Sequence, residues 1–223
     1  QPYQTMVAGA MTATVESGPV LAVDAVTLWR GERRLFEQLS FQLSPREMLH
    51  ITGPNGCGKT SLLRVICGLT LPETGVIRWR GEPIGRTRTD YHSELAYIGH
   101  RESLKAELSP TENLTCDLGL RRPPDAARVA QALADVELTG QRDIAVRGLS
   151  AGQKRRVSLA RCIASGAKLW VLDEPYTNLD VAGRDLVDTL MTRHLSEDGM
   201  VLLVAHQSHG VQGQITRTLE IQT

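Results

Sequence analysis

The sequence has no excess of either charge: 25 of its 223 residues are Lys or Arg and 25 are Asp or Glu. A neutral chain has no general attraction to nucleic acid or to anionic lipid, so the composition disfavours a nucleic-acid partner. Long apolar runs are also missing, because the longest, Met200–Ala205, is far shorter than the ~20 residues of a membrane-spanning helix. If the protein acts at a membrane, a partner has to hold it there.

Cysteines are few and widely spaced. The four cysteines form no CxxC pair, and no Cys/His cluster has the spacing of zinc ligands. The first ~20 residues lack a signal-peptide pattern, so we expect a protein of the reducing cytosol. Hydrophobic residues make up 41% and charged residues 22%, which is typical of a folded globular domain.

The sequence does contain alternating strand and helix signals. Apolar segments rich in Val and Leu predict strands at 20–29, 39–43, 48–52, 76–80, 95–99, 169–172 and 200–205. Capped or Ala-rich segments predict helices at 61–69, from 109, and at 125–136, 150–164 and 181–196. This alternation favours an α/β fold with a mostly parallel sheet. We expect residues 1–19 to form a loose tail and 20–223 a single domain, with a helical subdomain at about 101–164.

One motif is typical of phosphate binding. Residues 53–60 have the sequence Gly-Pro-Asn-Gly-Cys-Gly-Lys-Thr, which fits G-x-x-x-x-G-K-[ST] between a predicted strand and a predicted helix. Backbone N–H groups of such a loop surround a phosphate, and the helix N-terminus points at the same anion. Lys59 would contact the β- and γ-phosphates and Thr60 would reach Mg²⁺. The predicted nucleotide contacts here are Gly53, Pro54, Asn55, Gly56, Cys57, Gly58, Lys59, Thr60 and Ser61.

Two further segments supply chemistry that a phosphate loop needs. Asp173 and Glu174 end an apolar segment; the first can hold Mg²⁺ through water, and the second can accept or polarise the proton of an attacking water. Leu149-Ser-Ala-Gly-Gln153 opens a helix in which Ser150 is the cap and Gly152 exposes backbone N–H groups. This predicts a second anion-binding helix start, and the alternative is a plain cap followed by solvated basic residues.

Together these strings resemble the ATP-binding cassette (ABC) ATPases over nearly the whole chain. Residues 53–60 are similar to their Walker A loop, 149–153 to their signature motif and 177–180 to their D-loop, while Asp173 and Glu174 resemble the Walker B aspartate and catalytic glutamate. The resemblance implies a P-loop NTPase cassette with a mostly parallel core sheet, an antiparallel N-terminal β part and a helical subdomain. It also implies hydrolysis of ATP with Mg²⁺, in which Lys59 takes part.

The resemblance assigns roles to three more residues. His206 matches the switch histidine that senses the γ-phosphate, and Trp29 the aromatic that stacks on adenine, with a core tryptophan as the alternative. His100 stands where the family usually has Gln; imidazole is a poor Mg²⁺ ligand, so His100 keeps only the role of coupling to a membrane partner.

The family's geometry also implies a partner of the same kind. Ser150, Gly152 and Gln153 of one cassette would cover ATP on the phosphate loop of another, in a head-to-tail homodimer. Cys57, at the start of a helix, suggests a thiol-sensitive enzyme, and the alternative is a small filler residue.

Several features resemble one subfamily, the ATPase subunits of the bacterial cytochrome c maturation system. They are the short length, 97–100 with Gly-His in place of the usual Gln, 104–105, 112–114, 149–161 and 205–207. The resemblance implies a peripheral subunit at the cytoplasmic face of the inner membrane, bound to the transmembrane subunits of that complex, which powers haem export or release of haem from its chaperone. The alternatives are an ABC transporter ATPase for another substrate, a soluble ABC ATPase on nucleic acid and, disfavoured by the signature string, a P-loop kinase.

Overall fold

The computed structural model describes residues 20–100, 103–120, 123, 125–205 and 215–221, with the backbone alone at 215 and 216. The expected tail at 1–19 and His206 lie outside these residues. The strands are β1 (Leu21–Arg30), β2 (Arg33–Leu43), β3 (Glu47–Thr52), β4 (Thr74–Trp79), β5 (Glu82–Pro83), β6 (Leu95–Ile98), β7 (Leu169–Asp173), β8 (Met200–Val204) and β9 (Ile215–Glu220). The helices are α1 (Lys59–Ile66), α2 (Arg88–Ser93), α3 (Pro110–Gly119), α4 (Ala126–Asp135), α5 (Ala151–Ser165) and α6 (Val181–Ser196), with short 3₁₀ turns η1 (Thr139–Gln141) and η2 (Val146–Gly148).

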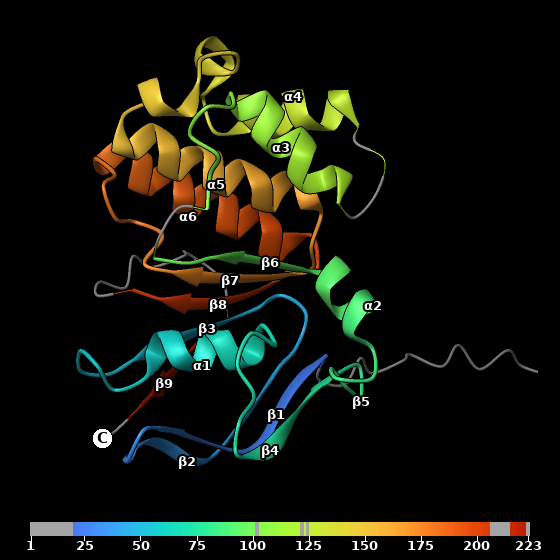
Figure 1. Cartoon of the computed structure of the whole chain (residues 1–223), viewed down its shortest axis with the longest axis vertical. Helices are drawn as coiled ribbons and strands as arrows, with labels where there is room; N and C mark the ends of the chain where they lie inside the picture. The colour runs from blue at the N-terminus through green and yellow to red at the C-terminus, as the bar shows by residue number, and fades with distance from the viewer. Residues whose placement is uncertain (1–19, 101–102, 121–122, 124, 206–214, 222–223) are drawn as a thin grey trace, which may run out of the picture.

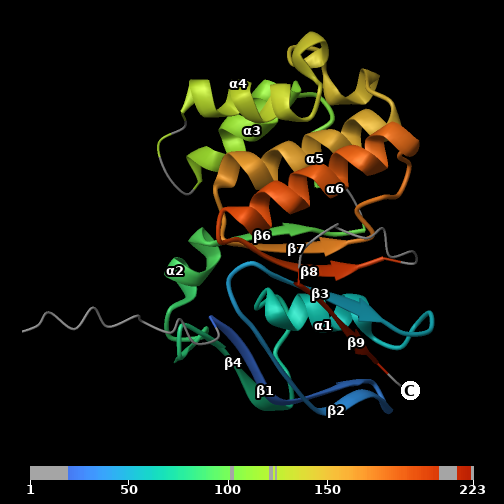
Figure 2. The same cartoon turned by 180° about the vertical axis from the view of Figure 1, so that it is seen from behind.

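The described elements form layers around a parallel sheet (Figure 1). That sheet has five strands in the order β6-β7-β8-β3-β9, and each of its strand pairs is parallel. Helices α5 and α6 cover one face and α1 covers the other, while α3 and α4 lie outside α5 (Figures 1 and 2). Beyond α1 lies an antiparallel sheet of four strands, β2-β1-β4-β5. The α/β class, with its parallel core sheet and antiparallel N-terminal part, is confirmed.

The two central strands show why the sheet forms in the middle of the molecule. Every residue of β7 and of β8 is buried, as expected for parallel strands covered on both faces. Alternate residues belong to different hydrophobic clusters: Trp170 and Leu172 pack on the side of α5 and α6, whereas Leu169 and Val171 pack on the side of α1. The carboxyl ends of both strands therefore emerge at one edge of a rigid sheet.

Polar caps fix where the helices begin. Ser109 caps α3 and Ser150 caps α5, each in a reciprocal capping box with the residue three positions later. Asp180 caps α6 by accepting a hydrogen bond from the Gly183 N–H group. Helices α3, α4 and most of α5 fall in the range where the sequence predicted a subdomain; a separate subdomain stays a prediction.

The structure also contains elements that the sequence analysis missed. Strand β2 begins at Arg33 rather than at residue 39, because it pairs with β1 along its whole length. Helix α2 has a single buried side chain, Tyr91, and so shows no apolar period. Strand β9 pairs with β3 at the end of the sheet, and its described side chains from Arg217 to Glu220 are exposed or partly exposed. None of the described helices combines the length and the apolar character that crossing a bilayer requires.

Gly75 provides a test of how the antiparallel sheet is packed. Its φ is 88°, and a Cβ placed there would lie 2.5 Å from the Ala25 carbonyl oxygen in β1. Gly81 has a similar φ of 84° but has no atom within 4 Å of such a Cβ. Gly81→Ala should therefore cost about 1 kcal/mol of unfolding free energy for the backbone conformation alone, and Gly75→Ala about 1–3 kcal/mol more for the clash. Urea unfolding of both variants measures the difference, and equal losses would contradict the packing.

Candidate active site

The phosphate loop joins the end of β3 to the start of α1. Helix α1 begins at Lys59, and Gly58 before it has a φ of 109°. At the start of the loop Gly53 has a φ of 140°, and a Cβ there would lie 2.5 Å from the Ile221 carbonyl oxygen. The loop is thus held between the sheet and the chain that follows β9, with the N-terminus of α1 directed at the space that a phosphate would fill.

A hydrogen bond joins the two halves of the predicted metal site. The Thr60 hydroxyl donates to Oδ2 of Asp173 at 2.9 Å, although 113 residues separate the two in sequence. Asp173 is 2% exposed at the end of β7. One hydroxyl and one carboxylate form an oxygen donor set that suits Mg²⁺, which keeps several of its waters. These two residues fit the metal that the sequence predicts.

Lys59 lies across the loop that it follows. Its Nζ donates hydrogen bonds to the carbonyl oxygens of Gly53 at 2.7 Å and Pro54 at 3.0 Å. The ammonium group is therefore held over the curved backbone, at the place where the charge of a β- or γ-phosphate would lie.

A cavity of about 350 Å³ unites most of the predicted site. Its lining includes Asp173, Glu174 and His100 together with the phosphate loop. The loop residues among its lining are Asn55, Gly56, Gly58, Lys59, Thr60 and Ser61. The structure thus brings a candidate base, a candidate metal site and the histidine at the unusual position into one space. Gly53, Pro54 and Cys57 are not among the lining residues.

Trp29 lies beside this cavity and not within the core. Its side chain is 43% exposed and lines a second cavity of about 400 Å³, which shares Arg30, Leu35, Thr60 and Ser61 with the first. The Arg34 guanidinium lies 5.9 Å from the centre of its ring. The alternative of a core tryptophan is therefore wrong, and adenine stacking on Trp29 stays a prediction.

Cys57 corrects one expectation. Its side chain is completely buried, within the hydrophobic cluster on the α1 side of the sheet. A thiolate needs access to its reagent, so the predicted thiol sensitivity at Cys57 is wrong for this conformation. The filler alternative fits the structure, and the Cys57 N–H group donates to the Pro54 carbonyl oxygen within the loop at 3.3 Å.

Glu174 has a distinctive backbone. Its φ is 54°, a left-handed conformation that non-glycine residues rarely adopt and that often marks functional sites. Its N–H group donates to the Val204 carbonyl oxygen at 2.8 Å, which ties the turn after β7 to the end of β8. This turn gives the Glu174 side chain its place in the cavity wall.

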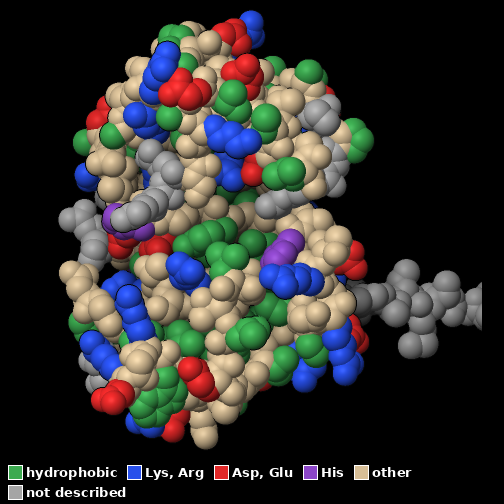
Figure 3. Space-filling view, in the orientation of Figure 1, with side chains coloured by type: hydrophobic (Ala, Val, Ile, Leu, Met, Phe, Trp, Pro, Cys, Tyr) green, Lys and Arg blue, Asp and Glu red, His purple; other side chains and the backbone are tan. Residues whose placement is uncertain are grey.

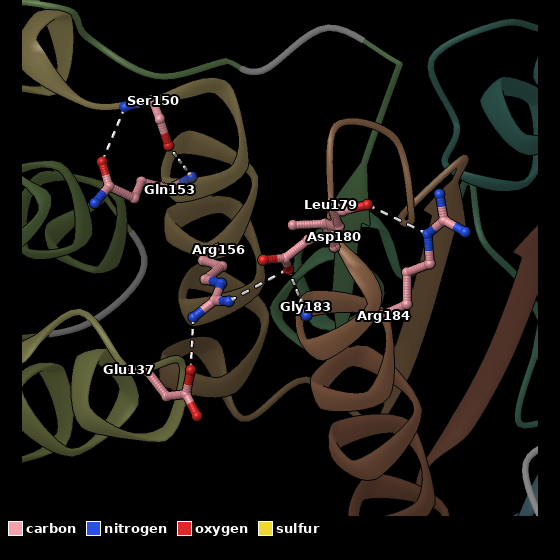
Figure 4. A network of polar contacts seen from close by, with 8 residues as sticks. All are labelled: Glu137, Ser150, Gln153, Arg156, Leu179, Asp180, Gly183 and Arg184. Atoms are coloured by element: carbon pink, nitrogen blue, oxygen red, sulfur yellow. Dashed lines mark hydrogen bonds and ion pairs between the residues drawn. The ribbon is translucent and has the colours of Figure 1, made fainter.

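The signature string forms a separate part of the surface, shown in Figure 4. The Ser150 N–H donates to Oε1 of Gln153 at 2.9 Å, and the Gln153 N–H donates to the Ser150 Oγ at 3.1 Å. The Ser150 oxygen thus acts as an acceptor, and its hydroxyl hydrogen can still donate to an anion. Arg156, from the same helix, pairs with Glu137 at 2.6 Å and with Asp180 at 4.0 Å.

Within one chain, the predicted nucleotide contacts lie in two separate cavities. Ser150, Gly152 and Gln153 line a cavity of about 600 Å³ that shares no lining residue with the cavity at the phosphate loop. The structure therefore brings Lys59, Thr60, Asp173, Glu174 and His100 together, but it does not bring the signature residues to them.

The sequence analysis missed Arg30 and Arg155. Arg30 lines the cavity at the phosphate loop and also the neighbouring cavity that Trp29 lines. Its place in the sequence directly after Trp29 was the available signal. Arg155 received no role of its own and is among the basic residues that the alternative interpretation of the signature string left in solvent, yet it is 2% exposed. Its neighbours on the helix face, Leu159 and Cys162, are also buried, so helical periodicity could have shown that Arg155 faces the core.

Comparison with known proteins agrees with this geometry. A family model described as "ABC transporter" matches residues 36–177. A cytochrome c biogenesis ATP-binding export protein CcmA from Methylococcus capsulatus is 48% identical over 194 residues, which cover 86% of this chain and 94% of that protein. The CcmA protein of Escherichia coli O157:H7 is 43% identical over 205 residues, which cover 92% and 98%. The chain belongs to the CcmA branch of the ABC transporter family.

A solved structure agrees on the fold. The ATP-binding subunit of an ABC transporter, 24% identical, superposes with a TM-score of 0.77 over 84% of this chain and 79% of its own. As a member of the ABC family, the chain is an ATP-hydrolysing enzyme.

Lys59→Ala tests the phosphate loop. The change removes the cation that Gly53 and Pro54 hold over the loop, so ATP affinity should fall roughly 10- to 100-fold, since hydrogen bonds to a charged group contribute about 1.5–3 kcal/mol. Titration calorimetry with MgATP measures the change. Lys168→Ala is the matched control, because the Lys168 Nζ bonds the Glu197 carbonyl away from the site. Equal affinity in the Lys59 variant would refute its assignment.

Proposed function

We propose that the chain is the ATPase subunit of a membrane exporter for cytochrome c biogenesis, and that it powers haem export or the release of haem from its chaperone. The observation that carries the catalytic part is the Thr60–Asp173 hydrogen bond in a cavity that Glu174 also lines. The names of the relatives, all CcmA proteins of cytochrome c biogenesis, support the biological role.

In this proposal each residue of the cavity has a separate task. Lys59 binds the β- and γ-phosphates, and the loop backbone surrounds them. Thr60 and Asp173 hold Mg²⁺, which neutralises charge on the phosphates when it is bound. Glu174 orients and polarises the attacking water. His206 stays a proposal as the γ-phosphate sensor, because it lies outside the described residues.

The second nucleotide-binding half comes, we propose, from another copy of the chain. Helix α5 begins at the signature string, and its positive end together with the Ser150 hydroxyl suits a phosphate. Within one chain these groups line a different cavity from the phosphate loop. A head-to-tail pair with two-fold symmetry would bring each signature string to the partner's ATP.

Glu174→Gln tests this dimer. The variant keeps the shape of the side chain but loses the base, so bound ATP should persist and hold two chains together. Sedimentation should show a dimer with MgATP and a monomer without it. Adding Lys59→Ala should abolish the dimer, because ATP no longer binds. A monomer of Glu174→Gln at saturating MgATP would contradict the arrangement.

The proposed location is the cytoplasmic face of the inner membrane, where transmembrane subunits bind the chain. A groove of about 480 Å³ lies between β6, α2 and the helices α3 and α5, and Figure 3 shows hydrophobic side chains gathered at the hollow on this face. Leu69 and Leu120 at the groove are 55% and 87% exposed. Exposed leucines beside a groove suit an apolar protein partner.

We propose that His100 reports on this partner. Tyr97 lines the groove and His100 lines the nucleotide cavity, three residues further along the same segment. Burial, with a smaller contribution from the negative charge of Asp173, raises the pKa of Tyr97 to about 12, so its phenol stays neutral. Because only two residues separate Tyr97 from His100, a partner that moves Tyr97 would also move His100.

Deletion of the gene tests the biological role. In a host that makes c-type cytochromes, covalently bound haem should disappear from them while b-type cytochromes persist. The wild-type gene should restore haem attachment and the Glu174→Gln gene should not. Normal haem attachment in the deletion strain would exclude this role and leave an ABC ATPase for another substrate.

The same strain tests His100. The His100→Ala protein should bind ATP normally but restore little haem attachment, and His100→Gln should be intermediate because an amide also donates and accepts hydrogen bonds.

A further inference from the structure

Arg155 is a buried cation behind the wall of the candidate site, bonded to the backbones of Asp173 and Glu174. It lies on α5 and is among the largest fully buried side chains of the described residues. Burying a guanidinium is costly unless its N–H groups are bonded, so its partners indicate what it holds in place.

The guanidinium donates to four backbone carbonyls. Nη2 donates to Asp173 at 2.8 Å and to Glu174 at 2.7 Å, and Nε donates to Pro175 at 3.2 Å. Nη1 donates to Gly99 at 3.0 Å. Three acceptors are therefore consecutive residues that run from the end of β7 into the turn after it, and the fourth directly precedes His100.

The turn after β7 needs such a constraint. Glu174 has a left-handed φ of 54°. Its carbonyl and side chain therefore point in directions that differ from those at the negative φ of most non-glycine residues. Its N–H group donates to the Val204 carbonyl oxygen, and its own carbonyl oxygen accepts from Arg155 at 2.7 Å and from the Thr177 N–H group at 3.2 Å. The direction of the Glu174 side chain thus depends on these bonds, of which the one to Arg155 is the shortest and the only one of the three from a charged donor.

The bond to Gly99 extends the constraint to the second segment of the cavity. Gly99 also packs against the Tyr97 ring, since a Cβ on Gly99 would lie 3.0 Å from the Tyr97 hydroxyl oxygen. One guanidinium therefore fixes the backbone beside His100 and beside Glu174 relative to the helix that begins at Ser150.

We infer that Arg155 is a positioning residue for ATP hydrolysis, because its guanidinium holds the backbones of Glu174 and Gly99 in one frame with α5. The inference rests on the proposed role of Glu174 as the residue that polarises water. Arginine suits the task because its five N–H donors lie in a fixed plane, whereas the lysine ammonium has three donors on a flexible stem.

The test uses Arg155→Lys and Arg155→Met in the full chain. ATP affinity should stay within about threefold of the wild type, because the four carbonyls that accept from Arg155 lie outside the phosphate loop. The kcat should fall about tenfold or more, because the carboxylate is misplaced. Arg193→Lys and Arg193→Met are the control substitutions. Arg193 pairs with Asp135 at 2.6 Å, neither residue is among those that line the cavity, and both variants should keep wild-type activity.

A double-mutant cycle separates positioning from general stability. If Arg155 acts through Glu174, Arg155→Lys should reduce the residual turnover of Glu174→Gln much less than it reduces that of the wild type. Four results would each overturn the inference. They are a wild-type kcat in folded Arg155→Lys, a parallel loss of ATP affinity and kcat, additive effects in the double-mutant cycle, and failure of both Arg155 variants to fold. Wild-type turnover by Glu174→Gln would instead reject the proposed role of Glu174.

Discussion

The hydrogen bond from Thr60 to Asp173 joins the first residues of α1 to the end of β7, across 113 residues of sequence. It can form only if β3 and β7 end at the same edge of the sheet. They do, because both strands pair parallel to β8, which lies between them. Parallel strands require crossover helices, and these helices start at that same edge with their positive ends. The sheet order thus determines which side chains can share a phosphate and a metal.

Much of this arrangement follows from local signals. The motif at 53–60 and the apolar strand before Asp173 each specify a phosphate or metal function, and strand–helix alternation implies that they meet. Ser150 and Ser109 were recognisable as helix caps, because a cap is defined by residues within one turn. The predictions failed where stability comes from distant pairing: β2 continues through polar residues because β1 lies beside it, and β9 is an exposed edge strand beside β3.

Single residues were harder to place than elements. Cys57 lies in a loop motif, yet its burial depends on the hydrophobic cluster beneath the loop. Arg155 is one of three consecutive basic residues, and its four carbonyl partners distinguish it from Arg156, whose contacts are carboxylates. Composition predicts exposure of both arginines equally well, and helical periodicity shows only that Arg155 lies on the buried face of α5. Which carbonyls it meets there depends on the tertiary position of the turn after β7, which no local pattern contains.

The division of the site between two cavities has an electrostatic consequence. Helix α1 directs its positive end at the phosphate loop, and α5 directs its own at the signature string. If two chains associate head to tail, these positive ends face each other and repel unless an anion lies between them. A triphosphate supplies that negative charge, and its cleavage divides the charge between two products. Binding and hydrolysis of ATP would therefore change the free energy of association directly, and under the proposed coupling role of His100 this is the work that would reach a membrane partner through Tyr97 and His100.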